Sequence, residues 1–383
     1  MDFELSEDQQ MIRATVAELA GKFDDHYWMT KDQNHEFPTE FYNAFAEGGW
    51  LGITTPEEYG GHGFGITEAS IILEEVAASG AGMNGASSMH LSIFGMHPVI
   101  VHGSEELKSR TLPRIVTGDL HVCFGVTEPG AGLDTTKITT FARREGDRYI
   151  VNGRKVWISK ALESEKVLLL TRTTKFEDVK RKTDGLTLFL TDLDRSKIEI
   201  RPIPKMGRNA VSSNELFIDG LEVPVEDRVG EEGEGFRYLV TNLPQERLSI
   251  AATGVAAARA AFDQTLAYVK ERQAFGQAVG GFQNTRFRMA EIATEIELGQ
   301  TFIDRCVLAL NARELTAEEA AMAKWWCTEL QKRVVDACVQ LHGGYGYMLE
   351  YPIARAYADA RITTIYGGTT EIMKEIIGRG LGV

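Results

Sequence analysis

One carboxylate in this sequence has the surroundings that a catalytic base needs. Glu246 and Arg247 follow Pro244 at the start of a segment, 243–270, whose periodicity predicts a helix with almost wholly apolar early turns. A glutamate in a first helical turn could simply interact with the helix dipole. Beside small apolar side chains, its pKa would rise and it could serve as a base. The segment alone leaves both interpretations open.

Three glycine-rich segments could bring the backbone close to a ligand. They are Thr-Glu-Pro-Gly-Ala-Gly-Leu-Asp at 127–134, Gln-Leu-His-Gly-Gly-Tyr-Gly at 340–346 and Tyr-Gly-Gly-Thr-Thr-Glu at 366–371. Glycine frees backbone N–H groups for close approach, and threonine with glycine before a helix is typical of a phosphate site. Taken singly, the first segment is better explained as an ordinary turn. Helix capping explains each of the other two equally well.

A tryptophan and a serine share one face of a predicted strand. Asn152-Gly153 predicts a tight hairpin turn, and the strand after it places Trp157 and Ser159 on one face and Ile158 on the other. A flat aromatic ring beside a small hydroxyl could cover a planar cofactor and bond to its edge. Taken alone, a tryptophan packed in the core is the better explanation.

Composition and charge narrow the classes of function. The chain has 383 residues, of which 43% are hydrophobic and 25% charged, so wholesale disorder is excluded. Its formal charge of −14 argues against a nucleic-acid or anionic-membrane partner, although a local basic site remains compatible with it. No apolar run has the length of a membrane span. Sequence motifs of dinucleotide binding, P-loops, zinc proteases and serine hydrolases are absent as well.

The cysteines and the first residues bear on location. The four cysteines have no zinc spacing and predict buried thiols in a reducing compartment, so we expect no metal site. The first fifteen residues carry four acidic side chains and no apolar core, which excludes a secretory signal and does not fit an Arg-rich transit peptide. The expected location is a bacterial-type cytoplasm, with the mitochondrial matrix left open.

These groups need three scaffolds to position them. Residues 1–120 predict helices, beginning with a capping box at Ser6 and Gln9. Short alternating runs over 121–232 predict an antiparallel β domain, and long helices return over 233–383. The expected fold is α+β, with an N-terminal helical domain, a central antiparallel β domain and a C-terminal four-helix bundle. The predicted helices are 41–47, 68–78, 105–112, 243–270, 284–312, 317–341 and 354–378, and the predicted strands are 139–144, 149–151, 155–159, 167–171, 186–191 and 215–218.

Together the motifs resemble the acyl-CoA dehydrogenase family of flavoproteins, over essentially the whole chain. They stand in the family's order: Phe-Gly-Val-Thr-Glu-Pro-Gly-Ala-Gly at 124–132, Trp-Ile-Ser at 157–159, Arg-Gln-Ala-Phe-Gly at 272–276, Gln-Leu-His-Gly-Gly at 340–344 and Tyr-Gly-Gly-Thr-Thr-Glu at 366–371. The resemblance implies one FAD per subunit, a homotetramer built as a dimer of dimers, and conversion of an acyl-CoA thioester to the trans-2-enoyl-CoA in fatty-acid β-oxidation. A base would remove the α-proton while the β-hydride passes to flavin N5, and electrons would leave to an electron-transfer flavoprotein.

The resemblance also implies a role for each matching position. Trp157 would cover the isoalloxazine ring, Ser159 would reach flavin N5, and Arg247 would serve the CoA moiety. The positions implied to bind FAD on the subunit's own side are Phe124, Val126, Thr127, Gly132, Leu133, Trp157, Ile158, Ser159, Thr369 and Glu371. Those implied to bind the FAD of a neighbouring subunit are Arg272, Phe275, Gln283, Gln340, Gly343 and Gly344.

The catalytic base is implied to have moved. Gly367 stands where many family members carry the catalytic glutamate, and Leu133 stands where many have serine. In a minority branch, which includes the long-chain and isovaleryl-CoA dehydrogenases, the glutamate lies on the earlier helix, at the position of Glu246. Gly367 keeps its N–H for an oxyanion hole, with Tyr366 and Gly368 beside it in the substrate site. The motifs match the long-chain branch more closely, so long or branched acyl chains are expected.

The same fold could also serve other functions. A flavin monooxygenase would use reduced flavin and oxygen and needs no α-proton base, so Glu246 and Arg247 argue against it. A non-catalytic relative could keep the fold as a binding or assembly module, but an intact set of flavin motifs with a relocated base argues against that. An isovaleryl-type enzyme for short branched chains is the alternative within the same activity.

Overall fold

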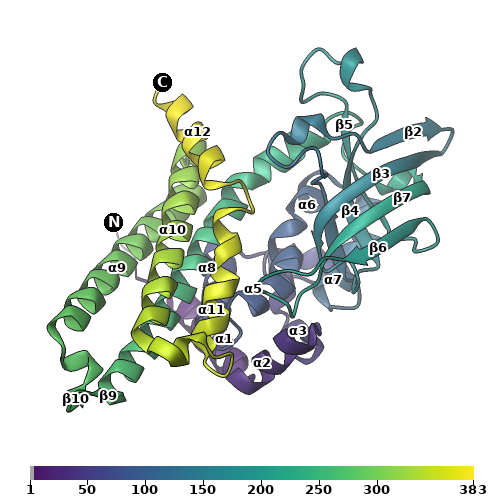
Figure 1. The fold of residues 1–383 in the computed structure, drawn as a ribbon. Helices are drawn as coiled ribbons and strands as arrows, with labels where there is room; N and C mark the ends of the chain where they lie inside the picture. Colours follow the sequence, from purple (N-terminus) through teal and green to yellow (C-terminus); the bar gives the residue numbers. More distant parts are fainter. Residues whose placement is uncertain (1–3) are drawn as a thin grey trace.

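The computed structural model describes residues 4–383, which form helical parts on either side of a β domain in sequence (Figure 1). The N-terminal helices are α1 (Glu7–Gly21), α2 (Asp25–Asn34), α3 (Thr39–Glu47), α4 (Ile66–Ala78), α5 (Gly82–His90), α6 (His97–His102) and α7 (Glu105–Val116). The predicted capping box is confirmed, because Ser6 Oγ accepts the Gln9 N–H at 3.2 Å and Gln9 Oε1 accepts the Ser6 N–H at 3.1 Å. The short helices α2, α5 and α6 were not predicted from the sequence.

The middle of the chain forms one twisted sheet. Its strands are β1 (Val122–Gly125), β2 (Phe141–Glu145), β3 (Arg148–Ser159), β4 (Lys166–Arg172), β5 (Leu186–Asp192), β6 (Ile198–Pro202), β7 (Ser213–Pro224) and β8 (Arg228–Val229). They lie in the order β6-β7-β3-β2-β4-β5-β8, with β1 beside β4. Most neighbours are antiparallel, as predicted, but β1 and β2 each pair with β4 in parallel.

The hairpin turn predicted at Asn152-Gly153 is wrong. Both residues lie inside β3, whose register with β7 shifts between Val151 and Gly153. A strand as long as β7 offers pairing on both sides of this point, so the irregularity becomes a bulge rather than a reversal. The Asn152 side chain accepts the Gly220 N–H of the β7 chain at 2.8 Å instead of forming a turn.

The C-terminal part of the chain differs from the prediction in two places: its first helix begins earlier, and its last predicted helix is divided into two. Its helices are α8 (Gly235–Glu271), α9 (Gln283–Asn311), α10 (Ala317–His342), α11 (Pro352–Ala360) and α12 (Thr370–Gly380), with the small hairpin of β9 (Gln273–Ala274) and β10 (Gln277–Ala278) after α8. The prediction that α8 begins at 243 is wrong, because Pro244 lies inside the helix. A proline inside a helix loses its own backbone hydrogen bond and its ring crowds the carbonyl four residues earlier. Packing of the preceding turns, which include the buried Tyr238 and Leu239, offsets this cost. The glycine turn at 367–368 divides the segment predicted as 354–378.

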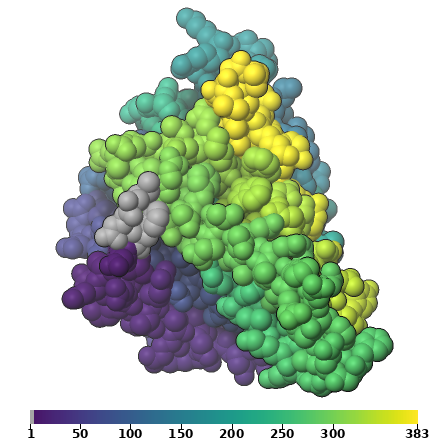
Figure 2. Space-filling view, turned by 90° about the vertical axis from the view of Figure 1, so that its left-hand side faces the viewer, coloured from purple at the N-terminus to yellow at the C-terminus, as the bar shows by residue number. Residues whose placement is uncertain are grey.

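The two helical parts share one hydrophobic core. Val16, Phe41 and Ile72 from the N-terminal helices belong to the same buried cluster as Val255 and Leu330 from α8 and α10. Figure 2 shows α9 and α10 lying across one face of this body, with the N-terminal helices beside them and α12 at the far end. Within residues 4–383, no helix is long and apolar enough to cross a membrane. The β domain therefore packs against a single helical body built from both ends of the chain.

Candidate active site

Glu246 lies on α8 about three turns after the helix begins, so the first-turn dipole interpretation is wrong. Its side chain is half-buried. Burial raises the pKa of Glu246 above its usual value, while the neighbouring Arg247 acts in the opposite direction. The carboxylate thus keeps some accessible surface although the protein around it disfavours its charged form. That position suits a base that must meet a substrate without bulk water.

The turn that carries Tyr366, Gly367 and Gly368 lies against α8 beside Glu246. A Cβ atom on Gly367 would come within 2.4 Å of the Ile250 Cδ1 atom, and Ile250 lies one helical turn after Glu246. Burial raises the pKa of Tyr366, and the Glu246 carboxylate raises it further. The glutamate and the glycine turn, far apart in sequence, thus lie side by side in the fold.

Glycine is required at this turn for conformational reasons. Gly367 and Gly368 have φ values of 65° and 97°, in the left-handed region that other residues adopt only with strain. Within the described chain, the Gly367 N–H donates no hydrogen bond to another protein group. A free N–H beside a carboxylate base is suited to an oxyanion site, in which the N–H donates a hydrogen bond to negative charge that develops on a ligand.

A buried lysine that sequence reasoning missed supports this turn. Lys324 on α10 is fully buried, and its Nζ donates to the Gly368 carbonyl at 2.6 Å. The pKa of Lys324 is lowered to about 8, chiefly by burial and also by the nearby Arg247, against the opposite effect of Glu329 and Glu371. A single lysine within the apolar and polar pattern of one helix gives no sequence signal that could have revealed this contact.

We expect Lys324→Met to lower kcat by roughly tenfold or more while FAD content stays unchanged, because the Gly368 carbonyl loses its donor and the Gly367 N–H is no longer held in place. The lysine loses its charge as the pH rises through its pKa of about 8, which weakens the bond to Gly368. The wild-type protein should therefore show a decline in kcat on the alkaline side that the variant lacks. Identical pH profiles for the two proteins would show that Lys324 only fills space.

Arg247 is buried where the sequence predicted a contact with CoA. It is 7% exposed, burial lowers its pKa, and its Nε atom has no hydrogen-bond partner in the described structure. A buried guanidinium nitrogen without a partner is costly unless a ligand completes it. The orphaned Nε is therefore compatible with an anionic or polar ligand group, and contact with CoA stays a prediction.

Trp157 occupies an exposed bulge of the sheet rather than the core. Its side chain is 60% exposed and its φ is 59°, at the point where the register of β3 and β7 shifts between Lys155 and Ile158. A Cβ atom on Gly132 would lie 3.8 Å from the Trp157 ring, so the first glycine loop faces the indole. Leu133 next to it is 66% exposed. An apolar ring held out on a rigid strand suits stacking on a planar ligand.

A buried ion pair that the sequence did not reveal fixes this loop. Lys155 and Glu128 are 0% and 4% exposed, and Lys155 Nζ contacts Glu128 Oε1 and the Val126 carbonyl at 2.9 Å each. The backbone N–H groups of Thr139 and Thr140 also donate to the Glu128 carboxylate, at 2.7 and 2.9 Å. Glu128 belongs to the recognised motif, but the sequence shows neither its burial nor its partner.

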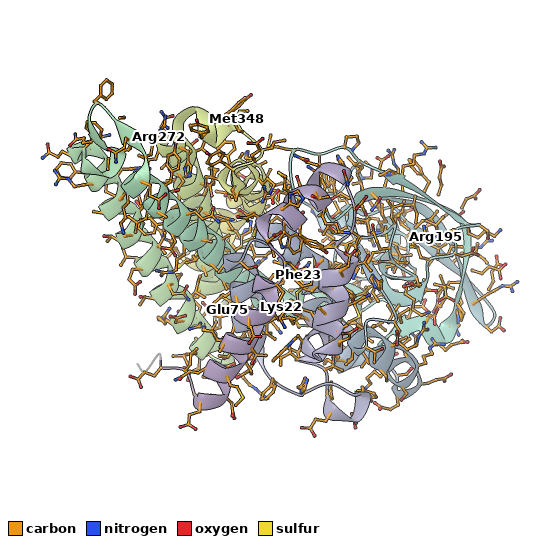
Figure 3. All side chains as sticks on the ribbon, turned by 90° about the horizontal axis from the view of Figure 1, so that it is seen from below. Lys22, Phe23, Glu75, Arg195, Arg272 and Met348 are labelled. Carbon is orange, nitrogen blue, oxygen red and sulfur yellow. The ribbon has the colours of Figure 1, made fainter. Side chains whose placement is uncertain are left out.

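The remaining predicted FAD residues divide between two places. Thr369 accepts the Ile372 N–H at 3.3 Å and so caps α12, which confirms the capping interpretation of that segment. The group assigned to a neighbouring subunit lies at the opposite end of the helical body from the β domain, where Figure 3 shows Arg272 and Met348 close together and Arg195 far away. Its members, all exposed, are Arg272, Phe275, Gln283, Gln340, Gly343 and Gly344.

This end of the molecule is built as an open surface. The Arg272 guanidinium lies 5.2 Å from the centre of the Tyr345 ring, which links the two motifs. Phe275 is 98% exposed, and a Cβ atom on Gly343 or Gly344 would meet nothing within 4 Å. Packing within one chain therefore explains neither the exposure of Phe275 nor the presence of glycine at position 344. Within one chain, these residues and Trp157 do not form one site.

Three family models match the chain in sequence order. They are the N-terminal domain of acyl-CoA dehydrogenase over residues 6–119, the middle domain over 123–221 and the C-terminal domain over 233–382. The chain belongs to the acyl-CoA dehydrogenase family. Members of this family are FAD-dependent oxidoreductases, so this acyl-CoA dehydrogenase relative has FAD as its cofactor.

Several relatives of this acyl-CoA dehydrogenase family member are similar over nearly its whole length. The mitochondrial long-chain specific acyl-CoA dehydrogenase of Sus scrofa is 39% identical over 345 residues, which cover 90% of this chain and 79% of the relative. A caffeyl-CoA reductase-Etf complex subunit of Acetobacterium woodii is 31% identical and covers 97% of both chains. The crystal structure of an acyl-CoA dehydrogenase from Geobacillus kaustophilus has a TM-score of 0.94 at 38% identity, covering 99% of each chain.

The described residues fit the flavin that this family uses. The exposed Trp157 ring, the facing Gly132 backbone and the half-buried Ser159 offer a flat surface edged by polar groups. These groups would hold the isoalloxazine ring, which accepts a hydride at N5 when FAD is bound. The individual binding roles stay predictions.

Proposed function

We propose that this protein catalyses the α,β-dehydrogenation of an acyl-CoA thioester, with Glu246 as the base that removes the α-proton. The observation that carries the proposal is the juxtaposition of the half-buried Glu246 carboxylate with the Gly367 turn, through Ile250. The raised pKa of Glu246 brings the carboxylate closer to the acidity of an activated α-proton. Tyr366 and the Gly367 N–H lie beside it to position the thioester.

Each residue of this group has a separate task in the proposed reaction. Glu246 accepts the α-proton, the Gly367 N–H donates to the thioester oxygen as negative charge develops there, and Arg247 binds the CoA part of the substrate. Lys324 holds the turn through the Gly368 carbonyl. Because the base and the oxyanion donor come from different elements, the packing of α8 on the turn sets the geometry of the reaction.

The assembly and the electron acceptor are also proposals. We infer a homotetramer, a dimer of dimers, because Phe275 and Tyr347 are 98% and 87% exposed, and Phe287 and Leu298 on α9 are 59% and 61% exposed. Large apolar side chains that no part of their own chain covers favour contact with further copies. An electron-transfer flavoprotein is the proposed acceptor, supported by the Acetobacterium relative named as part of an Etf complex. A place in fatty-acid β-oxidation and a long or branched acyl chain, both expected from the resemblance, stay predictions.

The direct test is anaerobic reduction of the bound flavin. The purified protein should be yellow, and acyl-CoA thioesters of four to sixteen carbons should bleach it at rates that rank the chain lengths. Formation of 2-enoyl-CoA in the same samples confirms dehydrogenation. Bleaching by NAD(P)H with no response to any acyl-CoA would instead favour a flavin monooxygenase and contradict the proposal.

We expect that moving the glutamate to position 367 does not by itself restore activity to Glu246→Gly. In the double variant Glu246→Gly/Gly367→Glu, the new residue adopts a φ near 65° and its Cβ meets Ile250 Cδ1 at 2.4 Å. Strain of this kind costs about 1–3 kcal/mol, so kcat should stay at least roughly tenfold below wild type. Adding Ile250→Ala should raise kcat of the double variant. Full activity without that third change would show that the turn does not exclude a side chain.

A further inference from the structure

Arg208 brings a positive charge to the side of Tyr366 that faces α5. Its guanidinium carbon lies 5.2 Å from the centre of the Tyr366 ring, and its Nη2 donates to the Ser87 hydroxyl on α5. The Tyr366 phenol interacts electrostatically with both Arg208 and Glu246. An acyl chain whose α-carbon lies at Glu246 and which passes Tyr366 would therefore arrive at Arg208.

No ion pair among the described residues balances this charge. Within residues 4–383, no carboxylate forms an ion pair with the Arg208 guanidinium, whose Nη2 donates to Ser87 and whose buried Nε has no hydrogen-bond partner. The Asp359 carboxylate accepts the Arg208 backbone N–H and interacts with the arginine only electrostatically.

The titratable groups that face Arg208 are the basic His90 and Lys205 and the acidic Asp359. Burial, with the charges of Arg208 and Lys160, lowers the pKa of His90 to about 4, so the imidazole is neutral beside two cations. A guanidinium with a free nitrogen in such surroundings is suited to an anion.

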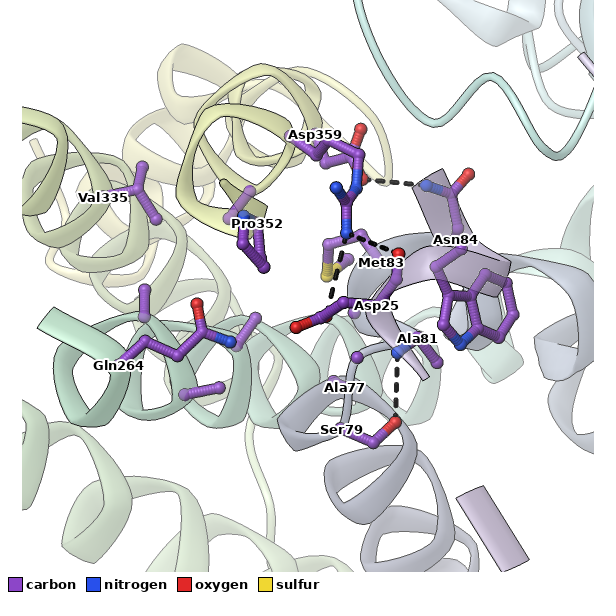
Figure 4. A pocket seen from close by; sticks show the side chains of 18 of the residues that line it. Asp25, Ala77, Ser79, Ala81, Met83, Asn84, Gln264, Val335, Pro352 and Asp359 are labelled. Atoms are coloured by element: carbon purple, nitrogen blue, oxygen red, sulfur yellow. Dashed lines mark hydrogen bonds and ion pairs between the residues drawn. The ribbon is translucent and has the colours of Figure 1, made fainter. Parts of the chain in front are cut away.

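The backbone around Arg208 is held by several hydrogen bonds, and the bond from Nη2 to Ser87 fixes the far end of the side chain. Asp359 on α11 accepts the Arg208 backbone N–H, not the guanidinium. Asp32 on α2 accepts the Asn209 N–H at 2.8 Å, and Asn84 Oδ1 on α5 accepts the Ala210 N–H at 3.1 Å. Figure 4 shows Asn84 and Asp359 joined by a hydrogen bond of 3.0 Å at the edge of a cavity of about 50 Å³. These contacts fix a φ of 55° at Arg208, which is costly for a non-glycine residue.

We propose that Arg208, with Ser87, binds a carboxylate at the far end of the acyl chain, so that the substrate is the CoA monothioester of a dicarboxylic acid. This inference rests on the proposed dehydrogenase function and names its substrate class. An unbranched alkyl chain would leave the guanidinium desolvated and unpaired, whereas a terminal carboxylate supplies the missing acceptor and the opposite charge. The substrate so inferred differs from the long or branched alkyl chain that the motif resemblance led us to expect.

The test compares two matched series of thioesters on the FAD-loaded protein. One series carries a terminal carboxylate (glutaryl-, adipyl-, pimelyl- and suberyl-CoA), and the other ends in a methyl group at the same carbon number. The measured quantity is the ratio of kcat/KM between the two members of each length. Arg208→Met removes the charge, Arg208→Lys keeps it, and Arg201→Met removes an exposed arginine paired with Glu199 elsewhere on the β domain.

We expect the wild-type protein to favour the carboxylate at one length, and Arg208→Met to lower that ratio by roughly 100-fold. Arg208→Lys should lower the ratio less, and Arg201→Met should leave it unchanged. A wild-type preference for methyl-terminated chains at every length would overturn the inference while leaving the dehydrogenase function intact, even if Arg208→Met fails to fold. Flavin that neither series bleaches would instead overturn the dehydrogenase function itself, and this inference with it.

Discussion

Glu246→Gln is expected to lower kcat for acyl-CoA dehydrogenation by roughly 10³- to 10⁴-fold, at the upper end of what general base catalysis contributes. The amide matches the carboxylate in size but accepts no proton at neutral pH. Glu246 lies on α8, whereas Trp157 and the 127–134 loop, which are predicted to bind FAD, belong to the β domain. The variant should therefore keep its FAD and bind acyl-CoA normally, so that kcat falls and KM changes little.

The acid side of the pH profile gives an independent reading of the same group. Only the carboxylate form of Glu246 accepts the α-proton, so kcat/KM falls as the pH is lowered through its pKa. Burial raises that pKa above its ordinary value, and the decline should begin at a higher pH than for an exposed glutamate. The residual activity of Glu246→Gln should show no such decline. An unchanged acid limb in the variant would assign the titration to another residue.

Glu128→Gln is expected to lower the free energy of unfolding by about 3–5 kcal/mol and to release much of the FAD, because it leaves Lys155 charged in the interior without its partner. Burial alone would raise the pKa of Glu128, but Lys155 and the hydrogen bonds of Thr139 and Thr140 lower it overall. A carboxyl whose folded pKa is lowered stabilises the fold above its unfolded pKa, and this stability is lost as the pH falls through the folded value. The wild-type protein should lose this contribution in acid, and the variant should not. Thermal unfolding with flavin fluorescence measures both effects.

The matched control for this pair removes both charges. Glu128→Gln/Lys155→Met should recover much of the lost stability, because no uncompensated charge remains inside. If the single variant were as stable as wild type, the ion pair would not be what holds the loop. If the double variant were as unstable as the single one, the hydrogen bonds from Thr139 and Thr140 would be the main contribution.

The sequence predicted the parts of the site that depend on residue type and order. Glu246, the glycine turn at 367–368 and Trp157 each stand in a motif, and the first two meet in the structure through Ile250. The sequence did not predict the side chains that contact the site from distant parts of the chain. Lys324 bonds to Gly368 across two elements, and Arg208 reaches Ser87 and Tyr366 from the β domain. Neither arrangement leaves a local pattern in the chain.

The fold shows the same division. The predicted bounds of the long helices α9 and α10 agree with the structure to within one residue, since their apolar periodicity persists over many turns. The hairpin turn predicted at Asn152-Gly153 does not form, because strand pairing with β7 on both sides outweighs the turn preference of these two residues. The start of α8 was misplaced by Pro244, a residue that usually marks a first turn but that tertiary packing accommodates here inside the helix. That error also placed Glu246 in the first turn, whereas the structure places it about three turns in.

The central claim, that Glu246 removes the α-proton, is tested most directly by proton exchange without oxidation. An acyl-CoA analogue with sulfur in place of the β-carbon has no β-hydride to give, so exchange of its α-hydrogens with D₂O reports the base alone. The measurement is the deuterium content of the analogue by mass spectrometry after incubation with FAD-loaded protein. We predict rapid exchange with the wild-type protein and with Arg201→Met, and exchange slowed by roughly 10³-fold with Glu246→Gln. Exchange by Glu246→Gln at the wild-type rate would contradict the assignment.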